Sequence, residues 1–172
     1  MKSMANPKQK GKYLHRASKV IVRRAMKYFA AVVAEVLLTK FSWTPDGIHE
    51  FLFIFTDQCL SVNDGYIHVR EYAQMLADDY GYIVQVRNKA EQKDATIVRA
   101  LEQRMEDQCI QWLLDMIALV MLDKFGWDTT AVTRLVRNLD EYVLPFADGG
   151  SDHDARVAYL LANGVDMRRH LR

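Results

Sequence analysis

The tetrapeptide KFSW at residues 40–43 occurs again as KFGW at residues 124–127, an offset of 84 residues. The same offset aligns similar residues on both sides of the tetrapeptide, for example Val36 with Val120. Self-similarity at a fixed offset is the sequence signature of a repeated structural unit. The sequence therefore predicts a tandem duplication.

Each half is predicted to form three helices in the order helix-corner-helix-turn-helix, which makes the fold class all-α. Apolar residues at spacings of three and four predict the long first helices, and capping residues mark the start of the second ones. Gly81 and Gly164 are expected to end the third helices. The predicted helices are 18–40, one starting at Thr44-Pro45-Asp46, and 69–80 in the first half, then about 94–124, one starting at Asp128-Thr129-Thr130, and about 152–163 in the second.

These boundaries predict a division of the chain into five parts. They are a basic, partly flexible N-terminal arm (1–13), a first helical repeat (14–84), a connector (85–95), a second helical repeat (96–167) and a basic tail (168–172). The aromatic residues of the two tetrapeptides are predicted to pack in the corner between the first and second helices; they are Phe41, Trp43, Phe125 and Trp127. The alternative is an exposed aromatic platform that stacks nucleic-acid bases.

The net charge of +1 hides an uneven distribution. Residues 1–27 hold nine of the 23 Lys and Arg residues and no acid, so the rest of the chain has 14 basic and 22 acidic residues. Such a basic segment is typical of phosphate binding without base specificity. The predicted nucleic-acid-binding residues are Lys8, Lys10, Lys12, Arg16, Lys19, Arg23, Arg24 and Lys27. A solubilising segment, or one that docks on the protein's own acidic surface, is the alternative.

No catalytic, metal or cofactor site is predicted. The motifs HExxH, CxxC and GxSxG, which bring ligands or nucleophiles together, do not occur. The stretch 64–67 with Glu71 resembles the back half of an EF-hand loop. However, its first and third positions fall on Leu60 and Val62, which have no side-chain oxygen for calcium. We therefore expect a binding protein and not an enzyme.

Two further features concern the cellular setting. Cys59 and Cys109 lie within apolar helical patterns, which predicts two buried thiols in a reducing cytosol. The longest apolar stretches are too short to span a bilayer, and they are interrupted by Glu35 and Asp115. The expected location is the cytoplasm, and the expected partners do not include a membrane.

The chain resembles the small helical proteins carried by phages and mobile elements of gut bacteria. The first half has the motifs of this resemblance at Lys40-Phe41-Ser42-Trp43, Asp64-Gly65-Tyr66-Ile67 and Asp79-Tyr80-Gly81. The second half keeps KFGW but departs at Gly150-Ser151 and Asn163-Gly164. Some small proteins encoded beside such proteins are anti-CRISPR proteins, which block Cas9-type nucleases by binding. The resemblance therefore implies a bacterial host cell and a type II, Cas9-inhibiting anti-CRISPR role.

Two functions follow as hypotheses, and a third is weaker. The first is a non-enzymatic, phage-type interaction protein that binds a host protein or protein-RNA complex, with a Cas9-type nuclease as the concrete partner. Its acidic helical faces would compete for the nuclease's basic nucleic-acid channel. The second is a nucleic-acid-binding regulatory or architectural protein that uses the basic arm to bind RNA or DNA. The third hypothesis, an enzyme, is the weakest, because the sequence shows no pair of acid, base or nucleophile that would act together.

Overall fold

The computed structural model describes residues 7–63, 68–86, 97–142 and 152–170, with side chains for 20–62, 68–86, 104–142 and 152–170. Within these ranges the protein consists of six α-helices and one short 3₁₀ helix, without a strand. The prediction of an all-α fold is confirmed. The expected turn at Gly65, the first six residues of the arm, most of the connector and the last two residues of the tail lie outside the described residues.

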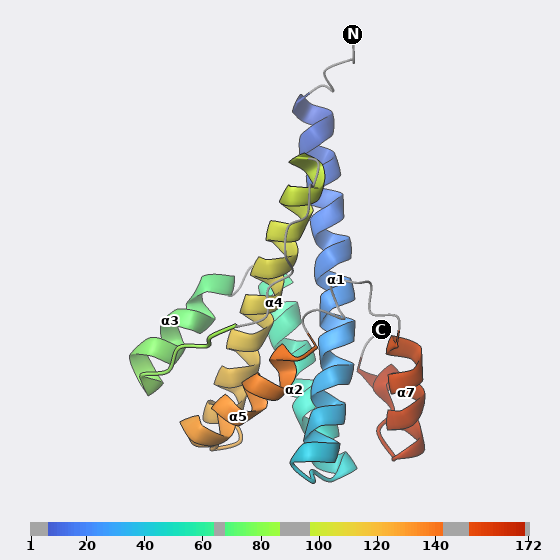
Figure 1. Cartoon of the computed structure of the whole chain (residues 1–172), viewed down its shortest axis with the longest axis vertical. Helices are drawn as coiled ribbons and strands as arrows, with labels where there is room; N and C mark the ends of the chain where they lie inside the picture. Colours follow the sequence, from blue (N-terminus) through green and yellow to red (C-terminus); the bar gives the residue numbers. More distant parts are fainter. Residues whose placement is uncertain (1–6, 64–67, 87–96, 143–151, 171–172) are drawn as a thin grey trace.

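Two long helices form the centre of the molecule. Helix α1 (Pro7–Lys40) and helix α4 (Ile97–Asp123) run side by side in the same direction, as Figure 1 shows. Residues 28–34 of α1 and 112–122 of α4 are all buried, so both helices contribute long stretches to the core. The upper ends of both helices extend beyond all other elements in Figure 1.

Helix α1 begins earlier than the sequence pattern indicated. The structure starts it at Pro7 and not at Ser18, so the first helix overlaps the second half of the predicted arm. Proline is favoured at the first helical position, because it has no N–H to leave unpaired there. Most of the residues that follow favour helix even without an apolar stripe; they include Lys8, Gln9, Lys10, Lys12, Leu14, Arg16 and Ala17.

The two corners have the same backbone geometry. Ser42 and Gly126 both adopt positive φ, at 54° and 64°. In each case the next residue, Trp43 or Trp127, donates its N–H over 3.0 Å to the carbonyl six residues before it. This arrangement satisfies a carbonyl at the helix end and stops the helix in a left-handed residue. Helices α2 (Pro45–Asn63) and α5 (Thr129–Asp140) then begin at the expected positions.

The third helices cross over between the halves. Helix α3 (Val69–Tyr80) packs mainly on α4, whereas α7 (His153–Ala162) packs mainly on α1. In Figure 1 they lie on opposite sides of the central pair. Helices α2 and α5 each contact both α1 and α4. The predicted repeats therefore do not fold as two separate triplets but share one hydrophobic core.

The ends of the third helices and the cysteines agree with the sequence analysis. Gly81 and Gly164 follow α3 and α7 with positive φ values of 60° and 87°. The chain then turns back, and the 3₁₀ helix η1 (Met167–Arg169) follows α7. Cys59 and Cys109 are both buried and unpaired, as predicted. Burial raises the pKa of both thiols, to about 12 for Cys109.

Candidate functional site

The tetrapeptide aromatic residues form one cluster between the two corners. Phe41 packs against Trp127 and Trp43 against Phe125, each with ring centroids 5.0 Å apart. The two tryptophan rings meet edge to face at 5.7 Å. All four side chains are half-buried against the core. The contacts therefore join the two corners to each other, a partnership that the sequence analysis, which placed each pair within its own corner, did not anticipate.

The predicted nucleic-acid-binding residues all lie on helix α1, and three of their side chains are described. Arg23 and Arg24 are exposed, and Lys27 is half-buried. The guanidinium of Arg24 forms an ion pair with Glu106 of α4 at 2.6 Å. Arg24 is thus partly neutralised within the protein. The side chains of the other five, Lys8, Lys10, Lys12, Arg16 and Lys19, lie outside the described ones.

Helix α2 presents a stripe of exposed acidic and apolar side chains. The spacing of its members alternates between four and three residues, so they lie on one helical face. Phe53 is 68% exposed and Leu60 53%, so two large apolar side chains on this one face are open to solvent. We call this surface the α2 stripe; it consists of Asp46, Glu50, Phe53, Asp57 and Leu60.

The opposite face of α2 explains why the stripe points outward. Ile48, Phe51, Leu52, Phe55 and Cys59 are all at most 1% exposed and belong to the core. Helix α2 has no Lys or Arg, so the carboxylates of the stripe have no basic neighbour on their own helix. The sequence analysis missed this surface, although the alternating spacing of acidic and apolar residues was visible in the sequence.

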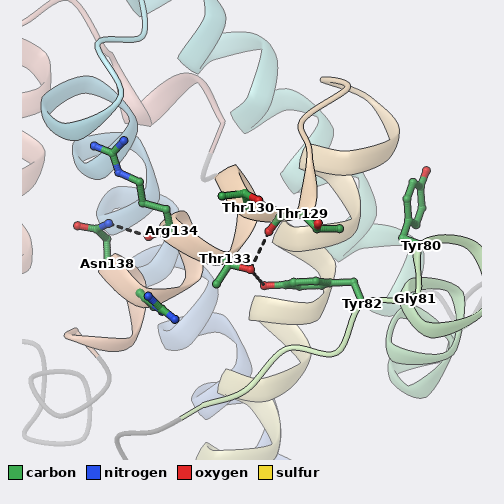
Figure 2. Close-up of a pocket in the computed structure, with 9 residues that line it drawn as sticks. Tyr80, Gly81, Tyr82, Thr129, Thr130, Thr133, Arg134 and Asn138 are labelled. Carbon is green, nitrogen blue, oxygen red and sulfur yellow. Dashed lines mark hydrogen bonds between the residues drawn. The ribbon is translucent and has the colours of Figure 1, made fainter.

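A second candidate surface is a groove between the end of α3 and the outer face of α5 (Figure 2). Its volume is about 650 Å³. Figure 2 shows Tyr82 and Thr133 pointing toward one another, and their hydroxyls form a hydrogen bond of 3.2 Å. We call it the α3–α5 groove; its lining consists of Tyr80, Gly81, Tyr82, Thr129, Thr130, Thr133, Arg134, Arg137 and Asn138.

Two side chains beside this groove, Asp128 and Arg134, are held by local structure. Asp128 caps the start of α5 by accepting the N–H of Ala131 at 2.7 Å, as its place before Thr129-Thr130 predicted. The Arg134 guanidinium lies 5.1 Å from the ring centroid of Phe41, a cation–π contact that restricts its motion. Corner and groove are therefore connected through one side chain.

Arg156 forms a buried charge cluster that attaches α7 to α1. Its side chain is 5% exposed and pairs with Glu35 of α1 and, at 2.8 Å, with Asp152. Its guanidinium also lies 4.9 Å from the ring centroid of Tyr142 and 5.5 Å from that of Tyr28. Paired and stacked in this way, a buried arginine has a structural role.

Two histidines connect the C-terminal segment to α2. His49 Nδ1 lies 2.8 Å from His170 Nε2, and His49 Nε2 lies 3.3 Å from the Gly164 carbonyl oxygen. A carbonyl only accepts, so the Gly164 contact requires a proton on His49 Nε2; with both rings neutral, His170 Nε2 then donates to His49 Nδ1. Burial lowers the pKa of His170, and the neighbouring His49 adds to the effect. Among the described side chains, no group of three metal-ligating residues occurs.

Comparisons of the chain with protein-family models, with curated proteins and with solved structures found no match. In the part of the chain that the structure describes, none of the helices combines the length and the apolar character that crossing a bilayer requires. The candidate binding surfaces of the protein are the α2 stripe, the basic end of α1 and the α3–α5 groove.

Proposed function

We propose that this protein acts by binding another macromolecule through the α2 stripe. The carrying observation is that two large apolar side chains, Phe53 and Leu60, are exposed on a face whose charged members are all acidic. Exposed aromatic and aliphatic side chains between charges are typical of docking helices. The complementary partner has an apolar groove bordered by Lys and Arg residues.

A nucleic-acid channel of a nuclease has this chemistry. It is basic because it binds phosphates, and it contains apolar positions that contact bases and sugars. A Cas9-type nuclease is therefore the partner that we propose first, in agreement with the expectation from the resemblance. Occupation of the channel by the acidic helix would exclude guide RNA or DNA by competition. The protein itself would carry out no reaction.

The direct test adds the purified protein to DNA cleavage by Cas9-type nucleases from several bacteria. Inhibition that is relieved by a Phe53→Ser/Leu60→Ser double variant supports the proposal. Each side chain is expected to contribute roughly 1–2 kcal/mol of binding, which is about a tenfold change in Kd per residue. Unchanged cleavage by every nuclease would eliminate this partner.

A matched control separates the stripe from general loss of apolar surface. Ile83 and Leu161 are also exposed, at 73% and 45%, but lie outside α2. An Ile83→Ser/Leu161→Ser variant removes a similar amount of apolar surface and should inhibit like the unmodified protein. If both double variants lose inhibition equally, the α2 stripe is not the docking surface.

A second proposed function is nucleic-acid binding by the basic end of α1. It is favoured by the position of this end, which extends beyond the other helices in Figure 1, and by the exposed Arg23. Phosphate contacts would make binding weaken steeply with salt. Deletion of residues 1–12 removes four of the nine basic residues of segment 1–27 and should weaken binding to RNA or duplex DNA. Full affinity of the deletion variant would refute this mechanism.

We also infer that the two halves arose by duplication of one three-helix unit. The matching corners, the reciprocal Phe41–Trp127 and Trp43–Phe125 contacts and the reciprocal packing of α3 and α7 support this inference. After duplication, equivalent helices were free to acquire different surfaces. A chain containing one half alone would expose the core face of its first helix, so we expect it to dimerise or to remain unfolded.

A further inference from the structure

The two halves of the protein differ in one pair of equivalent positions. The segment after α7 contacts the start of α2, whereas the segment after α3 leaves the α3–α5 groove beside the start of α5. After α7, Gly164 approaches the start of α2 so closely that an added Cβ would lie 3.3 Å from Cγ of Pro45. After α3, Gly81 has no atom of the described structure within 4 Å of its Cβ position. The C-terminal segment covers α2 through the His49–His170 contact, whereas the equivalent space over α5 remains a groove.

The two equivalent helices also differ in charge. At the offset of 84 residues, Arg134 and Arg137 of α5 stand where α2 has Glu50 and Phe53. Both arginines are exposed, and among the described residues neither has a carboxylate partner. Like charges three residues apart on a helix repel each other weakly. An external anion between them would relieve that repulsion.

Two carboxylates that precede the α5 part of the groove lining have partners inside the protein. Asp128 accepts the N–H of Ala131, and Asp123 pairs with Lys124 at 2.8 Å and accepts the Tyr80 hydroxyl at 3.4 Å. These contacts occupy the two acids. The Arg134 guanidinium lies over the Phe41 ring, but its N–H donors, like those of Arg137, have no carboxylate partner among the described residues.

We propose that the α3–α5 groove binds a phosphate group with an attached planar ring, the chemistry of a nucleotide unit. The arginines supply paired donors for the phosphate oxygens. The Tyr80 and Tyr82 rings at the other side supply faces on which a base can stack. The volume of about 650 Å³ lies within the range of small-ligand sites. The site is independent of the α2 stripe, so either proposal can fail alone.

The experiment titrates the full-length protein with adenosine monophosphate, with adenosine and with a short oligothymidylate, using calorimetry and amide chemical shifts. The phosphate-bearing probe should bind at least about tenfold more tightly than adenosine, because the charge-assisted contacts are lost with the phosphate. Shifts should concentrate at Thr129, Thr130, Thr133 and Asn138. A free nucleotide and a strand are distinguished by whether the monophosphate or the oligothymidylate binds more tightly.

An Arg134→Gln/Arg137→Gln variant should weaken binding of the tighter probe by about tenfold or more. The control variant Arg70→Gln/Arg104→Gln removes the same charge from exposed positions outside the groove and should change affinity by less than about twofold. Deletion of residues 1–12 and the Phe53→Ser/Leu60→Ser variant should leave the binding of adenosine monophosphate unchanged. Equal losses in both arginine variants, shifts outside the groove, or no binding of either phosphate-bearing probe at about 10 mM overturn the proposal. The amide shifts of the unmodified protein decide the question if a variant does not fold.

Discussion

Replacing Asp115 by asparagine should stabilise the protein at neutral pH. Asp115 lies in the C-terminal half of α4 and is only 5% exposed. One of its oxygens accepts a hydrogen bond of 2.9 Å from the side chain of Gln111. Burial raises the pKa of the carboxyl group to about 6, and the Gln111 hydrogen bond opposes this effect in part. At the offset of 84 residues the equivalent position is the fully buried Ala31, so a charge there is not required by the fold.

The expected magnitude follows from the pKa difference. Between the ordinary value of 3.8 and about 6, the native state binds the proton more tightly than the unfolded chain. Stability therefore falls as pH rises through this window, by at most about 3 kcal/mol at 1.36 kcal/mol per pKa unit. Asparagine has no such penalty, and its side-chain oxygen can still accept the Gln111 N–H. The Asp115→Asn variant should then be more stable than the unmodified protein by up to about 3 kcal/mol at pH 7.

The assay is urea unfolding of both proteins at several pH values between about 4 and 7, with the variant-minus-wild-type difference as the readout. All other titrating groups are common to both proteins and cancel in this difference. The difference should be small near pH 4 and should grow through pH 6. Asp78→Asn, an exposed change on α3, is the control and should show no such growth. A difference for Asp115→Asn that stays constant across the range would refute the reasoning.

Two other substitutions test the packing of α7 and the geometry of the corners. Arg156→Met should cost about 3 kcal/mol in urea unfolding because it leaves Glu35 without its cation, whereas Arg168→Gln breaks only an exposed pair and should cost much less. Equal costs would contradict the assignment of a structural role to the buried pair. Gly126→Ala should lower the free energy of unfolding by about 1 kcal/mol because its φ of 64° disfavours a Cβ, although no atom of the described structure blocks the space. Ser42 already has a Cβ in the same conformation, so Ser42→Ala should change the free energy of unfolding by less than half as much. A similar loss at both positions would exclude backbone strain as the cause.

The candidate surfaces were only partly predictable from the sequence. The basic segment of α1 was evident from charge counting, because a run of cations without acids needs no tertiary information. The exposure of Phe53 and Leu60 was not evident from the sequence, since an apolar residue on a helix of mixed character can face either the core or the solvent. The groove depends on a space between two segments that are about 50 residues apart, Tyr80–Tyr82 and Thr129–Asn138. No local sequence pattern indicates that such a space exists.

The sequence by itself determined the helices, their ends apart from the start of α1, and the equivalence of the two corners. Caps, positive-φ residues and apolar spacing act over a few residues, so Asp128, Gly81 and Gly164 have their effect wherever the helices are placed. Only the tertiary structure decided that the third helices cross to the other half, that the corner aromatics pair reciprocally and that equivalent faces of α2 and α5 remain exposed. These outcomes depend on which apolar faces bury each other, a choice made by the whole chain, because burial of apolar surface is non-directional and gains free energy with any complementary partner.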